Sequence, residues 1–119
     1  MSNRVRFDNR NDSENVIENV NEKVDLDSLK MSLMNKYNNC LKNVETIYTT
    51  IDVLADDRII VIENVENWIK GIGLLNVISL QFNNKVKHLH LYDLDNENKL
   101  LNRIINVCKK LDIFVTFGI

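Results

Sequence analysis

The stretch KVKHLHLYD, residues 85–93, holds both histidines of the 119-residue chain. Histidine is the side chain best suited to metal binding and to proton transfer near neutral pH. His88 and His90 are two positions apart, so in a strand both rings project from one face. A zinc site needs a third or fourth ligand, and Asp93 would lie on the opposite face. We therefore expect no metal, no cofactor and no catalytic residue here.

The same strand face is a candidate contact surface for a partner. Leu89 and Leu91 alternate with the histidines, and we expect them to point into the core while the other face meets solvent. Lysines flank this face and Tyr92 adds one large aromatic ring, which suits a protein contact. The predicted partner-binding residues are Lys85, Lys87, His88, His90 and Tyr92.

The remaining reactive groups give no recognisable active site. Cys40 and Cys108 lie far apart, which favours two buried thiols in a reducing compartment, with a disulfide between them as the alternative. Three glycines cannot form a glycine-rich phosphate loop, so nucleotide hydrolysis is not expected.

Charge and hydropathy restrict the partners further. The formal net charge is −2, so no general basic field exists, and a nucleic-acid partner is not expected. No apolar run approaches the roughly 20 residues that a membrane span needs. The N-terminus has no apolar signal-peptide segment. These features predict an intracellular protein, cytoplasmic or nuclear, with no membrane contact and no identified small-molecule substrate.

The chain divides into a polar arm and one domain. Residues 1–22 have no apolar period, and we expect them to be disordered or loosely held. Residues 23–119 are predicted to form a single α/β domain. It should open with a long amphipathic helix after Asp25 or Asp27, because apolar residues recur every three or four positions. That stripe contains Leu33, Tyr37, Cys40, Val44, Ile47, Ile51 and Leu54. Residues 44–53 remain open between helix and strand, since β-branched residues are dense there.

A small mixed sheet should follow. A second helix is expected from about Asp57 to Gly71 or Gly73, with a strand at 59–62 as the alternative. Residues 74–82 and 86–92 are expected to be strands, joined by a hairpin through Asn83 and Asn84.

The end of the chain predicts a β-α-β unit. Asp95 should cap a helix whose inner stripe leads into an apolar strand at 113–118, giving a right-handed parallel crossover from the strand at 86–92. The inner stripe is Leu100, Leu101, Ile104, Ile105 and Cys108.

Residues 75–119 also resemble the irregular, cysteine-containing leucine-rich repeats of F-box-type proteins. LLNVISLQFNN fits LxxLxLxxN at Leu75, Ile78, Leu80 and Asn83, and Cys108 with Leu111 is similar to the repeat's helix–strand junction. The resemblance implies a short α/β solenoid as the alternative fold, with the 85–92 strand on a concave binding face.

These features favour a non-enzymatic protein–protein interaction or assembly subunit of a larger complex, with a protein partner or a second copy of the chain. Two alternatives stay open. One is a small enzyme or regulatory subunit without a recognisable active site. The other is a nucleic-acid-binding module that uses the 85–92 strand face.

Overall fold

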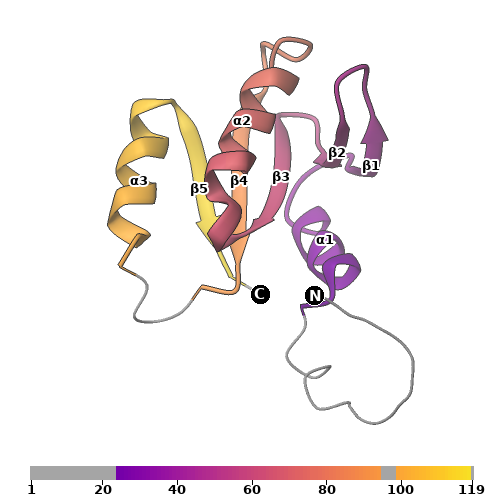
Figure 1. Ribbon diagram of the computed structural model, residues 1–119. Helices are drawn as coiled ribbons and strands as arrows, with labels where there is room; N and C mark the ends of the chain where they lie inside the picture. The colour runs from indigo at the N-terminus through magenta and orange to yellow at the C-terminus, as the bar shows by residue number, and fades with distance from the viewer. Residues whose placement is uncertain (1–23, 95–98, 119) are drawn as a thin grey trace, which may run out of the picture.

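A five-stranded mixed sheet in the order β1-β2-β3-β4-β5 forms the centre of the structure (Figure 1). The computed structural model describes residues 24–94 and 99–118. The strands are β1 (Leu41–Glu45), β2 (Thr50–Leu54), β3 (Arg58–Asn64), β4 (Val86–Tyr92) and β5 (Ile113–Phe117). The helices are α1 (Leu26–Met34), α2 (Trp68–Ile78), α3 (Leu101–Lys110) and the 3₁₀ turn η3 (Val65–Asn67). The predicted α/β class is thus confirmed. The predicted arm at 1–22 lies outside the described residues.

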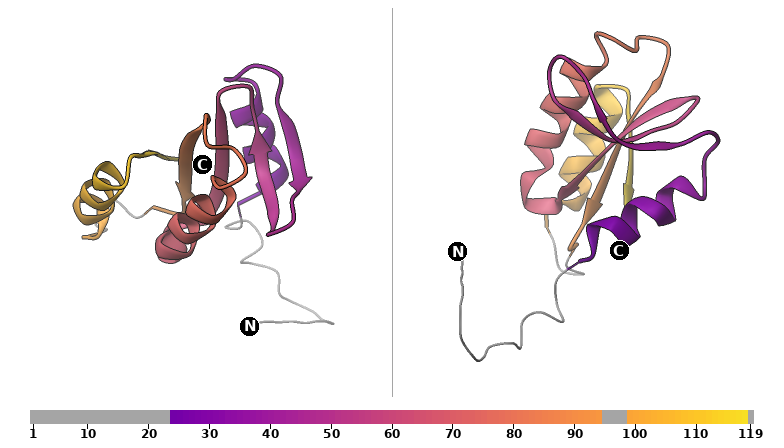
Figure 2. Two further views of the ribbon diagram at one scale, coloured as in Figure 1. Left: turned by 90° about the horizontal axis from the view of Figure 1, so that it is seen from above. Right: turned by 90° about the vertical axis from the view of Figure 1, so that its right-hand side faces the viewer.

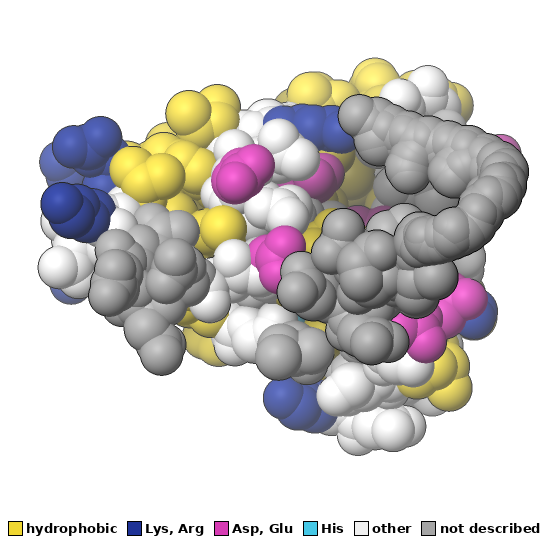
Figure 3. Space-filling view, turned by 60° about the horizontal axis from the view of Figure 1, so that its bottom comes forward, with side chains coloured by type: hydrophobic (Ala, Val, Ile, Leu, Met, Phe, Trp, Pro, Cys, Tyr) yellow, Lys and Arg dark blue, Asp and Glu magenta, His cyan; other side chains and the backbone are white. Residues whose placement is uncertain are grey.

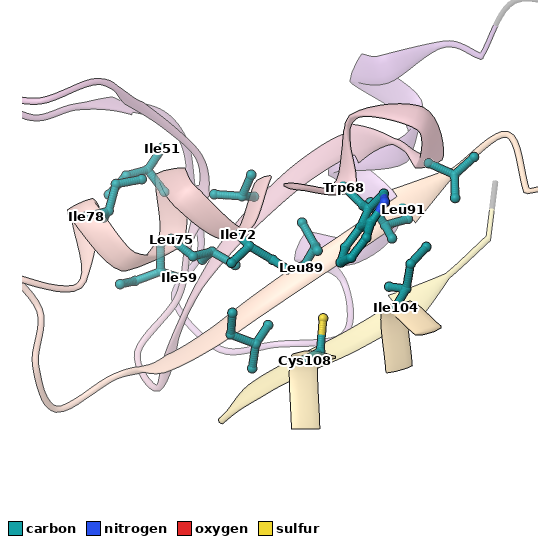
Figure 4. Close-up of a cluster of buried hydrophobic side chains, with 13 residues drawn as sticks. Ile51, Ile59, Trp68, Ile72, Leu75, Ile78, Leu89, Leu91, Ile104 and Cys108 are labelled. Carbon is teal, nitrogen blue, oxygen red and sulfur yellow. The ribbon is translucent and has the colours of Figure 1, made fainter. Parts of the chain in front are cut away.

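The helices cover both faces of the sheet. Helices α2 and α3 lie on one face and α1 lies on the other (Figure 2). The larger core fills the space under α2 and α3 (Figure 4). It includes Ile51, Ile59, Trp68, Ile72, Leu75, Ile78, Leu89, Leu91, Ile104 and Cys108. A smaller cluster lies under α1 and contains Leu29, Leu33, Val53, Ile60 and Ile62.

The predicted long helix is wrong. Helix α1 has only nine residues. Asp25 caps it, as one of the two predicted caps, because its Oδ1 accepts hydrogen bonds from the backbone N–H groups of Asp27 and Ser28. Beyond the helix, Asn39 has a φ angle of 55° just before β1, and Asn43 has one of 56° within β1. Asparagine tolerates this left-handed backbone, and at Asn39 it turns the chain toward β1.

The open segment 44–53 forms part of a β-hairpin. Strands β1 and β2 pair antiparallel. The hydroxyl of Thr46 accepts hydrogen bonds from the backbone N–H groups of Tyr48 and Thr49 and donates one to the Thr49 carbonyl, which closes the turn. Ile51 and Val53 are fully buried. The β-branched residues therefore decide this segment, although their spacing also fits a helix.

In the middle of the chain, a strand forms where a helix was expected and a helix forms where a strand was expected. Residues expected to begin a helix at Asp57 instead form β3, which agrees with the strand alternative at 59–62. Helix α2 then runs through both Gly71 and Gly73, and the predicted strand at 74–82 and its hairpin do not form. The LxxLxLxxN match thus falls on a helix and the turn after it, so the solenoid alternative is not supported.

The predicted β-α-β unit is confirmed. Strands β3, β4 and β5 are parallel neighbours, connected through α2 and α3. Cys108 is buried as predicted, and both cysteines are free thiols. The prediction that Ile105 lies on the inner stripe of the helix is wrong, because Ile105 is 38% exposed whereas Ile104 is fully buried. The predicted cap Asp95 lies outside the described residues.

Gly71 brings α2 close to the sheet. A Cβ atom at this position would lie 2.5 Å from Cδ1 of Leu89 and 3.2 Å from Cγ of Glu63. Leu89 is fully buried in the main core and has little room to shift. A Cβ atom at Gly73 would meet no atom within 4 Å. Two glycines of one helix therefore differ in what they do: only Gly71 permits the close approach of helix and strand.

This difference gives a paired prediction. Gly71→Ala should lower the free energy of unfolding by about 1–3 kcal/mol, the usual cost of overpacking a core. Gly73→Ala should raise it by roughly 0.5–1 kcal/mol, since alanine has the higher helix propensity and the site is open. Urea denaturation of both variants measures the two values. Equal effects of the two substitutions would contradict the close approach of α2 to β4.

Candidate functional site

Strand β4 carries the predicted partner-binding residues, but it does not present them on one surface. Leu89 and Leu91 point into the main core, as predicted. His88 and His90 occupy the opposite face, yet they are only 0% and 5% exposed. The prediction that both rings meet solvent is therefore wrong. Tyr92, predicted to face outward with them, is half-buried against the smaller cluster.

Side chains from three other segments cover His88. The ring of Tyr37 lies edge-on to the imidazole at a centroid distance of 5.8 Å, and the ring of Phe114 does so at 4.9 Å. The guanidinium carbon of Arg58 lies 4.2 Å from the Tyr37 ring centroid and 5.4 Å from that of Phe114. Arg58 thus contacts both aromatic faces, an arrangement stabilised by the ring quadrupoles. Asp57 holds the guanidinium through two hydrogen bonds of 2.9 Å and 3.1 Å.

The two histidines are joined through Thr116 on the neighbouring strand β5. Thr116 Oγ1 lies 2.8 Å from His88 Nε2 and 2.6 Å from His90 Nδ1. Nη1 of Arg58 lies 3.3 Å from His88 Nδ1. We call these four residues the His–Thr–His network.

The chemistry of the donors fixes the His88 end of this network. Arginine has only N–H donors, so His88 Nδ1 accepts and the proton of His88 is on Nε2. His88 Nε2 then donates to Thr116 Oγ1, and the same oxygen is hydrogen-bonded to His90 Nδ1. The other ring nitrogen of His90, Nε2, is buried and has no hydrogen-bond partner among the described residues.

Both imidazoles are held neutral. Burial lowers the pKa of His88 to about 3, and the positive charge of Arg58 acts in the same direction. Burial also lowers the pKa of His90, partly opposed by the backbone of Gly118. Tyr37 and Phe114 enclose the neutral ring of His88, and Thr116 joins it to the ring of His90. The network therefore serves packing and orientation, and it does not form an exposed contact surface.

Sequence reasoning missed Arg58, Thr116, Tyr37 and Phe114 as neighbours of the histidines. One signal was available. Thr116 is the single polar residue in IFVTF, and a buried polar residue requires a polar partner on an adjacent strand. Arg58 and Tyr37 gave no such signal. Arg58 comes near His88 because β3 pairs with β4, and Tyr37 does so because of the path of the chain after α1.

The two predicted lysines lie elsewhere, beside a groove between the C-terminal ends of α2 and α3. The groove has a volume of about 950 Å³. Its lining includes Leu80, Lys85, Lys87, Ile105, Lys109 and Phe114. Lys85 donates to the carbonyls of Ala55 and Asp56, and Lys87 donates to the Asn76 side chain and the Leu111 carbonyl. The structure thus separates these lysines from the histidines and groups them with α3.

Helix α3 presents a basic outer face, which we define as Lys99, Arg103, Lys109 and Lys110, with Asn102 and Asn106 between them. All six side chains are exposed. No acidic residue occurs from Lys99 to Leu111. Figure 3 shows Lys and Arg side chains without acidic neighbours at the end of the molecule where α3 lies, while acidic side chains lie in the middle and toward the opposite end. A net charge of −2 therefore conceals a local basic surface.

The comparisons with known proteins place the chain near two viral proteins. It is 35% identical over 85 residues to a KilA-N domain-containing protein of Acanthamoeba polyphaga mimivirus, a match over 71% of this chain and 33% of that protein. A second KilA-N domain-containing protein of the same virus is 29% identical over 85 residues, or 71% of this chain and 23% of that protein. The chain therefore spans a third or less of each relative. No family model and no solved structure matches.

These relatives overturn the suspected resemblance to F-box-type leucine-rich repeats, because the similar proteins are of another kind. Chance explains the repeat-like spacing, since leucine and isoleucine recur often in an apolar helix such as α2. Within the described part of the chain, no helix is long and apolar enough to span a membrane. Nor do three His, Cys, Asp or Glu side chains of that part meet in a metal-binding arrangement.

The neutral histidines predict a pH-dependent stability. An unfolded chain has His88 with an ordinary pKa near 6.5, whereas the folded value is about 3. Between these values the unfolded state binds a proton that the folded state does not. The free energy of unfolding should therefore fall as the pH is lowered from 6.5 toward 3, by about 1.4 kcal/mol per pH unit for this residue.

His88→Gln is the control, because an amide retains a donor and an acceptor but does not titrate. Burial raises the pKa values of Asp52 and Glu63, which gives the opposite pH dependence, and this part cancels between the two proteins. Urea denaturation at pH 7.5 and pH 5 should show a smaller loss for the variant than for the wild type. Parallel slopes in both proteins would show that His88 is not held neutral.

Proposed function

We propose that this domain binds nucleic acid and that the basic face of α3 is its contact surface. The observation that carries the proposal is the segregation of charge: cations line one exposed helix and no carboxylate interrupts them. Nucleic-acid affinity depends mainly on lysine and arginine contacts to phosphate, which neutralise charge and release counterions. Local charge, and not net charge, sets the field at such a surface.

The relatives support the same proposal. Both are named for the KilA-N domain, a domain of DNA-binding type. This agrees better with the nucleic-acid alternative than with an assembly subunit, and it runs against the expectation that the chain has no nucleic-acid partner. The chain spans a third or less of each relative. Nucleic-acid binding by this chain is therefore proposed, and the activity of the whole relatives is not transferred to it.

The proposed surface differs from the strand face expected from the sequence. Two of the five predicted residues, Lys85 and Lys87, remain near the new surface because they line the groove beside α3. His88 and His90 are enclosed and hold the sheet together. Asn102 and Asn106 add amide groups that donate and accept hydrogen bonds between the cations. Binding, without catalysis, is the activity proposed.

Charge removal on α3 tests the proposal. In the double variant Lys109→Gln with Lys110→Gln, binding to a fluorescent DNA oligonucleotide should weaken, since two phosphate contacts are lost. The slope of log K against log salt should become shallower by about 1 for each lost contact. Fluorescence anisotropy between about 50 and 200 mM salt gives both values.

The control is Lys42→Gln with Lys70→Gln, which removes the same charge from exposed sites on β1 and α2. It should leave affinity and slope nearly unchanged. If both double variants weaken binding equally, the effect comes from net charge and α3 is not the contact surface. Absence of salt-dependent binding by the wild type would overturn the proposed function itself.

A further inference from the structure

The groove beside α3 combines cations with exposed apolar side chains. Lys85, Lys87 and Lys109 line it together with a single acid, Asp112. Four apolar residues of the lining are exposed, namely Leu80 at 71%, Phe114 at 49%, Val86 at 41% and Ile105 at 38%. The ring of Phe114 packs on His88 on the opposite face of the sheet, so Leu80 and Ile105 are the apolar side chains that the argument uses. Its volume of about 950 Å³ lies at the upper end of the range for small-ligand sites.

Hydrogen bonds to neutral groups hold Lys85 and Lys87 at the groove, so neither charge is used in an ion pair. Lys87 uses two N–H donors, on the Asn76 side-chain oxygen at 3.1 Å and on the Leu111 carbonyl at 3.2 Å. An ammonium group has three donors, so one remains for an anion. The side chain of Lys109 makes no hydrogen bond or ion pair with the described residues. Lys85 donates to two carbonyls. The hydrogen bonds from Arg58 lower the pKa of the nearby Asp57 carboxyl, and the charge of Lys85 adds to that effect.

The lining matches the two parts of a nucleotide. A base offers a flat apolar face for Ile105 and Leu80 to contact, and its phosphate requires a cation such as Lys87 or Lys109. The bases of a duplex are stacked and paired, so they cannot enter a groove without being pulled out, which costs several kcal/mol. A single strand exposes its bases and pays no such cost.

We infer that the groove receives an unstacked base and that the domain therefore prefers single-stranded nucleic acid to duplex. This inference rests on the proposed function and specifies its substrate class. The basic face of α3 and the groove share Lys109. One strand can thus place its phosphates along α3 while a neighbouring base lies against Ile105.

The test compares a single-stranded DNA oligonucleotide with the blunt duplex of the same sequence and length. At one salt concentration the wild type should bind the single strand about five- to tenfold more tightly, which corresponds to roughly 40–55 Å² of apolar side-chain surface covered by the base. Ile105→Asn should weaken single-strand binding by a similar factor and leave duplex binding unchanged.

Ile69→Asn is the matched control, because Ile69 is an exposed isoleucine on α2 that does not line the groove. It should change neither affinity. Circular dichroism verifies that each variant is folded. If Ile105→Asn does not fold, Leu80→Asn replaces it with the same expected result, since Leu80 lies in the turn after α2 and is highly exposed.

The outcomes separate the two proposals. Equal or tighter binding of the duplex by the wild type overturns the single-strand inference and leaves the proposed function standing. Loss of selectivity in the Ile69 variant as well would show that the groove is not the site. Failure of the wild type to bind either DNA overturns the proposed function first.

Discussion

The parallel pairing of β3, β4 and β5 is the constraint on which the rest of the structure depends. Each parallel strand needs a long connection, and the connections here are α2 and α3, both on one face. That arrangement buries Leu89 and Leu91 under helices. The opposite face of β4 must then be enclosed by other means, since α1 lies over β2 and β3. Tyr37, Arg58 and Phe114 perform this task around His88.

A buried polar pair is stable only if its hydrogen bonds are satisfied in the fold. The His–Thr–His network meets this condition at three of the four ring nitrogens. Arg58 occupies His88 Nδ1, and Thr116 joins the two rings. The guanidinium is itself held by Asp57 and the two aromatic rings. Arg58 thus sets the tautomer of His88 and links this buried ring to the exposed carboxylate of Asp57.

The position of α3 links the fold to the proposed function. Helix α2 contacts β3 and β4, held close by Gly71, whereas α3 contacts β5. The space between their C-terminal ends is the groove, which Lys87 spans by its bonds to α2 and to the Leu111 carbonyl. Because α3 buries only Ile104 and Cys108, most of its remaining surface is exposed. The basic residues of that surface are therefore available to a ligand.

The sequence by itself determined the local features that depend on few neighbours. Alternation identified β4 and the inward direction of Leu89 and Leu91, the Asp25 cap located the start of α1, and the apolar end of the chain predicted β5. Where one segment fits two periods, tertiary contacts decided. Ile51 and Leu54 fit a helix by spacing but lie in β2, where Ile51 is fully buried. Gly71 lies inside α2, and its missing Cβ lets the helix approach Leu89 of β4 closely.

Only the tertiary structure decided what the candidate site is. Side-chain alternation gives the face of a strand, but it does not say whether that face is covered. Residues 37, 58, 114 and 116 contact the histidines from positions that are 26 or more residues away along the chain. The groove likewise brings together residues from the segment after α2 and residues from α3 and β5, which are separated along the chain. Distances of this kind are set by strand register, and strand register depends on the whole core.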